Sequence, residues 1–265
     1  NAQVSGLGEV KTQYRGSDAA MPYFEKGLLH LYAMDYKEAA ENFSMAQLLD
    51  PNFAMAAWGE AMSYYRPFTG ETQMTGGQAA LYKLAVTEDK RLAKAETSIE
   101  KGLLNIAEII FSKDRGTQYQ KDTALSNAYE NLYLLHQDET EALVWYAMHH
   151  LEKYLIKNEK SSAALALKAT QKALSQSPGH PGALFCKILS TPANEVKTEI
   201  TETARHYQKT AEASVIARHI ASRPFAAAGL WKEFTDANTA AFALSEKNRS
   251  SRKGGIDDLF FHAFW

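Results

Sequence analysis

The chain has 265 residues, of which 45% are hydrophobic and 23% are charged, as in ordinary globular proteins. Its 29 basic and 31 acidic side chains leave a net charge of −2, so charge gives no reason to expect nucleic acid or an anionic membrane as a partner. No apolar run approaches the ~18 residues of a membrane span, and a single cysteine, Cys186, excludes an intrachain disulfide.

The chain opens with NAQVSGLGEVKTQYRG, which contains three glycines and has no helical period. We therefore expect residues 1–18 to form an extended N-terminal arm, with Ser17 or Asp18 capping the first helix. The chain begins at Asn1 rather than at Met, as expected either for a mature exported protein or for a trimmed chain.

The next segment, residues 23–51, predicts two antiparallel helices with the spacing of a tetratricopeptide repeat (TPR). Gly27 faces Ala39 and lets the two helices approach closely, and Phe43 lies four residues further along the same face. Pro51 then ends the second helix. Generic amphipathic pairs carry leucines at such positions and do not require a glycine and a terminal proline together.

The same pattern returns later in the chain, so the sequence predicts a repeat protein. Ala166, Ala173 and Pro178 repeat the spacing of Ala39, Ala46 and Pro51, although the two copies are not separated by a multiple of 34 residues. We predict an all-α fold, an α-solenoid of irregular TPR-like antiparallel helix pairs with about 12–14 helices. Residues 19–265 are expected to form a single domain. The glycine-rich segment Phe68–Gly77 is longer than a TPR turn, and we expect it to be a functional loop.

Two segments carry a resemblance to a known family. Residues 50–62 (DPNFAMAAWGEAM) and residues 180–184 (HPGAL) resemble a family of bacterial, usually exported, TPR-like proteins. Weaker matches follow the same order through nearly the whole chain. The resemblance implies an α-solenoid located in the periplasm or secreted, and it implies little about biochemical activity.

The resemblance also suggests a metal site, and the sequence argues against it. Members of the family carry inward-facing histidines that could bind a transition metal such as copper, zinc or iron. Here His180 and His219 remain, whereas Arg66 and Arg223 stand where the family pattern places histidines. Arginine repels a cation. We therefore expect no metal cofactor, with His180, His219 and His262 as the alternative ligand set.

Several aromatic and basic residues are candidates for a partner-binding groove. In a TPR array the first helix of each pair lines the concave face, and aromatic and arginine side chains there suit a peptide with acidic or C-terminal carboxylate groups. The candidates are Phe24, His30, Trp58, Tyr65, Arg66, Arg218, His219 and Arg223. The adjacent His149 and His150 point about 100° apart on a helix, so we expect surface or partly packed histidines.

Three functional hypotheses follow. The first is a non-enzymatic scaffold that binds a protein or peptide in its concave groove, without nucleic acid and without a membrane span. The second is a metal-dependent enzyme or metal-binding protein that uses the remaining histidines. The third is a structural subunit of an oligomer or larger assembly, held through the apolar C-terminal segment Leu259–Trp265.

Overall fold

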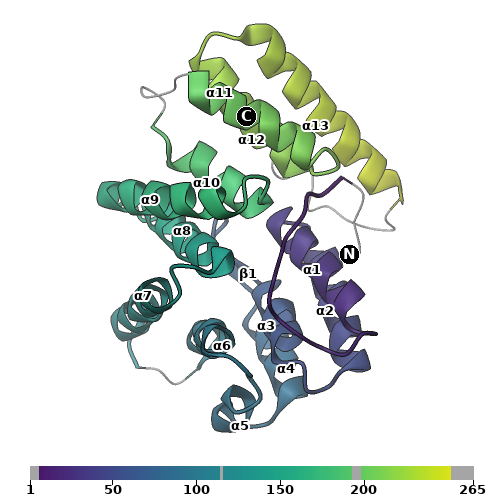
Figure 1. Ribbon diagram of the computed structural model, residues 1–265, viewed down its shortest axis with the longest axis vertical. Helices are drawn as coiled ribbons and strands as arrows, with labels where there is room; N and C mark the ends of the chain where they lie inside the picture. The colour runs from purple at the N-terminus through teal and green to yellow at the C-terminus, as the bar shows by residue number, and fades with distance from the viewer. Residues whose placement is uncertain (1–5, 114–115, 193–197, 252–265) are drawn as a thin grey trace.

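The computed structural model describes residues 6–113, 116–192 and 198–251, and this part of the chain is all-α apart from one small hairpin (Figure 1). The elements are α1 (Met21–Tyr32), α2 (Tyr36–Leu49), α3 (Ala54–Met62), β1 (Tyr65–Arg66), β2 (Glu71–Thr72), α4 (Met74–Leu84), α5 (Glu88–Leu92), α6 (Ser98–Phe111), α7 (Gln118–Leu135), α8 (Thr140–Leu155), α9 (Lys160–Gln176), α10 (Pro181–Ser190), α11 (Thr198–Thr210), α12 (Val215–Ala227) and α13 (Trp231–Ser251).

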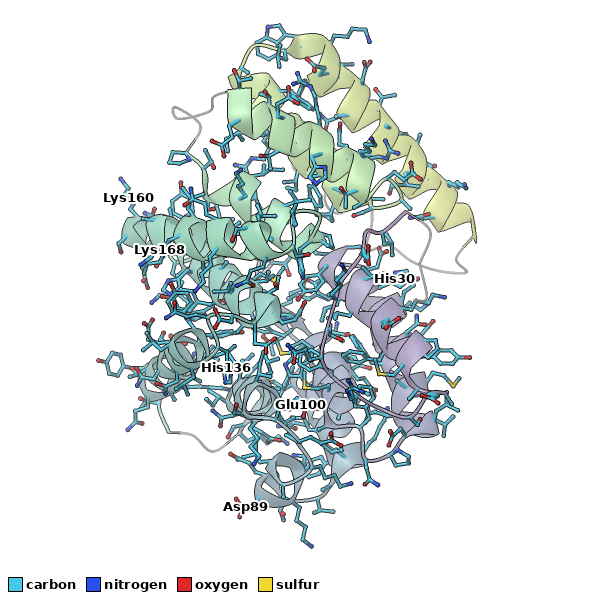
Figure 2. The ribbon with its side chains drawn as sticks, in the orientation of Figure 1. His30, Asp89, Glu100, His136, Lys160 and Lys168 are labelled. Atoms are coloured by element: carbon cyan, nitrogen blue, oxygen red, sulfur yellow. The ribbon has the colours of Figure 1, made fainter. Side chains whose placement is uncertain are left out.

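Consecutive helices pack against one another along the chain, with side chains filling the spaces between them (Figure 2). The most extensive packing lies within the pairs α1/α2, α8/α9 and α12/α13. The thirteen helices of the described residues fall within the predicted number, and the predicted all-α, solenoid-like class is confirmed. No helix in the described part of the chain combines the length and the apolar character needed to cross a membrane.

Small residues allow the first helices to meet, as the sequence pattern predicts. Phe43 of α2 is fully buried between Gly27 of α1 and Gly59 of α3. A Cβ atom at Gly59 would lie 2.4 Å from the Phe43 ring, and one at Gly27 would lie 2.9 Å from it. The two glycines therefore set the spacing of α1, α2 and α3 around one aromatic ring.

The curved array also closes on its inner side. All nine residues of α3 are buried, as are Glu141–Leu151 of α8. The α1 helix contacts α10 (Figure 1), and Trp58 of α3 packs edge to face on Trp145 of α8 with 5.1 Å between ring centroids. The space where an open solenoid has a concave face is thus filled by side chains from the first helices and from α8 in the middle of the chain.

The predicted loop Phe68–Gly77 is only partly a loop. Tyr65 pairs with Thr72 and Arg66 with Glu71 in a two-residue hairpin, and α4 then begins at Met74. Gly77 is a packing residue inside α4, because a Cβ atom there would lie 2.1 Å from the Phe111 ring of α6. The glycines at the end of this segment therefore serve helix packing, which the sequence pattern did not distinguish from a flexible loop.

The described part of the N-terminal arm has no regular secondary structure. Residues 6–16, which we call the strap, run along α1 as the dark purple trace of Figure 1. The C-terminal segment Leu259–Trp265 lies outside the described residues.

The contact between Gly59 and Phe43 predicts a loss of stability in Gly59→Ala. The added methyl overlaps a buried ring, and such overpacking costs about 1–3 kcal/mol, more than the ~1 kcal/mol that alanine gains in a helix. We expect chemical denaturation to give a free energy of unfolding lower by about 1–2 kcal/mol. Gly179→Ala is the control, because its Cβ atom would meet its nearest neighbour at 3.7 Å. Equal stability of the two variants would contradict the packing argument.

Candidate functional site

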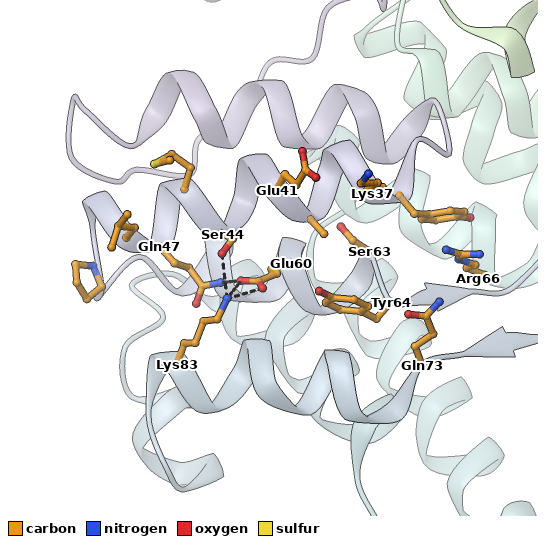
Figure 3. Close-up of a pocket in the computed structure, with 15 residues that line it drawn as sticks. Lys37, Glu41, Ser44, Gln47, Glu60, Ser63, Tyr64, Arg66, Gln73 and Lys83 are labelled. Carbon is orange, nitrogen blue, oxygen red and sulfur yellow. Dashed lines mark hydrogen bonds and ion pairs between the residues drawn. The ribbon is translucent and has the colours of Figure 1, made fainter. Parts of the chain in front are cut away.

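A broad hollow lies between α2 and α4, with α3 as its floor, and we call it the α2–α4 groove (Figure 3). Its volume is about 940 Å³. The lining residues are Tyr36, Lys37, Ala40, Glu41, Ser44, Met45, Gln47, Leu48 and Pro51 from α2 and the turn after it, and Glu60, Ser63, Tyr64, Arg66, Gln73 and Lys83 from the elements that follow.

A buried carboxylate anchors the floor of the groove. Glu60 of α3 is only 4% exposed, and it accepts hydrogen bonds from Lys83 Nζ of α4 at 2.6 and 2.8 Å and from Gln47 of α2. Lys83 also donates to Ser44 Oγ at 3.0 Å. Burial raises the pKa of the Glu60 carboxyl, and the hydrogen bond and charge of Lys83 act in the opposite direction. The network fixes three helices and leaves no unbalanced charge in the floor.

The outer edge of the groove is apolar. Leu48 is 73% exposed and Met45 is 38% exposed, both on the α2 face that also presents Lys37 and Glu41. Exposed apolar side chains beside a hollow offer contacts to another molecule. Ala40 lies on the same face, and its small side chain leaves the middle of the groove open.

The β1–β2 hairpin closes the end of the α2–α4 groove near Tyr36. The Arg66 guanidinium lies over the Tyr36 ring, 5.3 Å from its centroid, and Arg66 Nη1 lies 3.4 Å from Glu71 Oε2. Stacking on an aromatic ring holds the guanidinium in one orientation. The groove lining contains neither histidine nor cysteine, and its charged and polar side chains can form ion pairs and hydrogen bonds beside the apolar edge.

The structure corrects the predicted concave-face residues. Phe24 and Trp58 are fully buried, Phe24 among Tyr14, Phe43 and Phe53, and therefore do not line an open groove. They are core residues because the inner side of the array is closed. Two others, His30 and Tyr65, contact carboxylate side chains of the protein itself.

His30 Nδ1 lies 3.2 Å from Asp35 Oδ2, and the Tyr65 hydroxyl donates to Glu152 Oε2 at 2.8 Å. Of the eight predicted residues, only Arg66 lines the α2–α4 groove.

The remaining candidates lie on α12 and do not join this site. Arg218 Nε donates to the carbonyl oxygen of Glu212 at 2.8 Å, and His219 Nδ1 donates to Asn238 Oδ1 at 2.9 Å. Arg223 is exposed on the same helix. The predicted set is therefore distributed over at least two separate surfaces.

The alternative ligand set is not assembled by the described residues. His180 precedes α10, and its Nδ1 accepts a hydrogen bond from the Ala183 N–H, so Nε2 carries the proton and donates to Glu141 Oε1 at 2.9 Å. His219 is bonded to Asn238, and His262 lies outside the described residues. Within residues 6–113, 116–192 and 198–251, no group of three or more His, Cys, Asp or Glu side chains is arranged to hold a metal ion.

Glu141 joins three helices that are far apart in sequence. Besides His180 of the α10 cap, the Tyr32 hydroxyl of α1 donates to Glu141 Oε2 at 2.5 Å, and all three side chains are buried. Burial raises the pKa of the Tyr32 hydroxyl, and the Glu141 charge raises it further. Tyr32 therefore stays neutral and serves as a donor to the buried carboxylate.

His149 and His150 differ from the expectation of surface or partly packed histidines. Both are buried in α8, and the His149 ring stacks on Tyr129 of α7 with 4.3 Å between centroids. Burial lowers the pKa of His149 to about 3 and that of His150 to about 4. The nearby Lys153 lowers both pKa values, whereas Glu130 and Glu159 raise that of His150.

Comparison with known proteins finds no matching family model and no matching curated protein. The groove is therefore assigned from its geometry. Sequence reasoning missed Met45, Leu48, Glu60 and Lys83 as groove residues. The helical positions of Met45 and Leu48 could have indicated the apolar edge of the groove. In a helix whose inner face is already supplied by Ala39, Phe43 and Ala46, the apolar residues Met45 and Leu48 fall on the outer face.

Tyr32→Phe tests the buried contact with Glu141. Removal of the hydroxyl leaves a buried carboxylate with one donor fewer, which costs about 1–3 kcal/mol in the free energy of unfolding. Tyr119→Phe, at a residue that is 79% exposed, is the matched control and should leave stability unchanged. Urea denaturation measures the free energy of unfolding of both variants. A Tyr32→Phe protein as stable as the control would show that the Tyr32–Glu141 hydrogen bond does not stabilise the fold.

The buried histidines predict a loss of stability in mild acid. Their pKa values are lowered in the folded protein, so protonation of the unfolded chain near the ordinary pKa of 6.5 favours unfolding as the pH falls. At pH 5 the expected loss is about 2 kcal/mol for each histidine relative to pH 8. Unfolding measured between pH 8 and pH 5 should show a shallower slope in His149→Phe, which keeps a ring against Tyr129. The same slope in both proteins would show that His149 binds a proton in the folded state.

Proposed function

We propose that the protein is a non-enzymatic TPR-like scaffold that binds a peptide segment of a partner protein in the α2–α4 groove. The observation that carries the proposal is the open hollow of about 940 Å³ between an apolar edge at Met45 and Leu48 and a fixed guanidinium at Arg66. Peptide-binding grooves combine apolar anchor sites with a few oriented charges in this way.

The dimensions suit a short segment. The lining runs along α2 from Tyr36 to Leu48, which corresponds to ~18 Å at the helical rise of about 1.5 Å per residue. That length accommodates about five residues of extended peptide or about three turns of a helix.

The charges favour one orientation of the peptide. Lys83 is neutralised by Glu60 in the floor, whereas Lys37 and Arg66 lie near the hairpin end. Glu71, the partner of Arg66, is exposed and is replaceable by an incoming carboxylate. We therefore propose a peptide with apolar side chains against Met45 and Leu48 and with an acidic side chain or C-terminal carboxylate near Arg66.

The metal-dependent alternative lacks comparable support, because His180 and His219 are each hydrogen-bonded to other side chains. The larger-assembly alternative concerns Leu259–Trp265, which lie outside the described residues. Periplasmic or secreted location is proposed on the family resemblance alone.

Selection of peptides from a random 12-residue display library on the intact protein tests the proposal. We expect the selected peptides to contain apolar residues followed by a carboxylate. Ala40→Trp should weaken the binding of these peptides tenfold or more, because the indole fills the groove. Arg66→Ala should weaken the binding of carboxylate-bearing peptides and leave the binding of peptides without a carboxylate unchanged. Fluorescence anisotropy with synthetic peptides gives the dissociation constants.

Ala164→Trp on the exposed face of α9 is the matched control, with the same side chain away from the groove. It should bind the selected peptides as the unmodified protein does. Peptides that bind the unmodified protein, Ala40→Trp and Ala164→Trp with equal affinity, or a selection that enriches none, would count against the groove as a binding site.

A further inference from the structure

The strap has the residue pattern of a bound extended peptide. Side chains in an extended chain alternate between two faces, and here burial alternates in step with the sequence from residue 8 to residue 16. The partly or fully buried positions are Gly8, Val10, Thr12, Tyr14 and Gly16, and the exposed positions are Glu9, Lys11, Gln13 and Arg15.

Two side chains anchor the strap. Leu7 is 4% exposed and forms a small apolar cluster with Leu29 of α1 and Ala33 at the C-terminal end of that helix. Tyr14 is 3% exposed and meets the Phe24 ring edge to face at 5.9 Å between centroids. The helical body therefore offers two apolar sites to residues seven positions apart, and the positive φ of Gly8 turns the chain so that both residues face the body.

The two glycines at positions 8 and 16 of the strap each have a structural reason. A Cβ atom at Gly16 would lie 2.4 Å from the Phe53 ring. Gly8 has a φ of +99°, which favours glycine, and it packs against Pro181. The surface beneath the strap thus selects a pattern of small, apolar and aromatic residues.

The strap is held by side chains far more than by its backbone. The Ala213 N–H donates to the carbonyl oxygen of Gly6 at 2.7 Å, and Gln13 Nε2 donates to the Glu139 carboxylate at 3.0 and 3.1 Å. From residue 7 to residue 15, no backbone group of the strap pairs with the backbone of another described segment. Segments with few backbone hydrogen bonds open at low free-energy cost while the helices remain folded.

The fit of the strap is also incomplete. A cavity of about 120 Å³ lies beneath residues 11–14, against Glu139 and Thr140. Tyr14 lines this cavity, and its buried hydroxyl has no hydrogen-bond partner among the described residues. A buried hydroxyl without a protein partner lowers affinity, so the strap leaves room for a better ligand.

We infer that the face beneath the strap is a second peptide-binding surface, occupied in cis by residues 6–16. Its partner is an extended segment of another protein that places an aliphatic residue and an aromatic residue seven positions apart, with small or apolar residues facing inward and polar residues facing outward. Such a segment binds by displacing the strap. This surface is separate from the α2–α4 groove and does not depend on the function proposed for that groove.

A labelled peptide with the sequence of residues 1–16 tests the inference on the full-length chain. In the variant Leu7→Ala/Tyr14→Ala the protein's own strap is weakened, and we expect the peptide to bind it at least tenfold more tightly than it binds the unmodified protein. The reason is that a tethered strap competes at a millimolar effective concentration. Fluorescence anisotropy measures both affinities.

Peptide variants identify the surface. Tyr14→Ala in the peptide should abolish binding, Lys11→Ala should leave it unchanged, and Tyr14→Phe should bind at least as tightly as the native sequence. Binding that ignores Tyr14→Ala, or a peptide that does not bind the variant protein, would overturn the inference.

Hydrogen exchange of the unmodified protein gives an independent test that does not rely on the variant folding. We expect backbone amides of residues 7–15 to exchange through local opening, at denaturant concentrations where α1 remains protected. Exchange of these amides only through global unfolding would show that the strap is a permanent part of the core, and it would equally overturn the inference.

Discussion

The architecture depends on the pairing of one buried carboxylate. A charge removed from water is costly unless donors surround it, and Glu141 of α8 obtains its donors from Tyr32 of α1 and from His180 at the start of α10. These partners lie 109 and 39 residues away in sequence. Glu141 can obtain both donors only if the first helix pair packs against α8 and the start of α10 in the middle of the chain. This contact closes the inner side of the helical array, which would otherwise be open.

Closure limits where the proposed peptide binding could take place. An open helical solenoid offers its concave face, but in this array the inner side is filled by Trp58, Trp145 and Tyr32, which pack ring against ring. The proposed binding therefore uses the outer side of the array, where α2 and α4 leave the groove, or the face along which the strap lies. Both surfaces lie on the outer side of the array for the same reason. The side chains on the inner side are buried against one another, so grooves remain accessible only on the outer side.

Local patterns in the sequence predicted local packing well, since Gly27, Phe43 and the small residues near them act within one or two neighbouring helices. Contacts across the array were beyond such patterns. Nothing local shows that Trp58 meets Trp145, because that contact depends on the accumulated angles of the four helices between α3 and α8. Gly77 was assigned to a loop for a related reason, since a glycine that admits Phe111 from α6 has the same local sequence as one that frees a turn.

The alternating contacts of the strap are also visible as a pattern in the sequence. Glycines and the absence of a helical period predict an extended segment, and the polar residues Glu9, Lys11, Gln13 and Arg15 also alternate with small or apolar ones, which is the period of a chain lying on a surface. Its anchor Tyr14 touches Phe24, and Phe24 in turn touches Phe43 with 5.6 Å between centroids. Phe43 also sets the spacing of α2 against α3, the floor of the groove. Because neighbouring side chains couple energetically, substitutions at Tyr14 and in the groove should be measured singly and together before either surface is treated as independent.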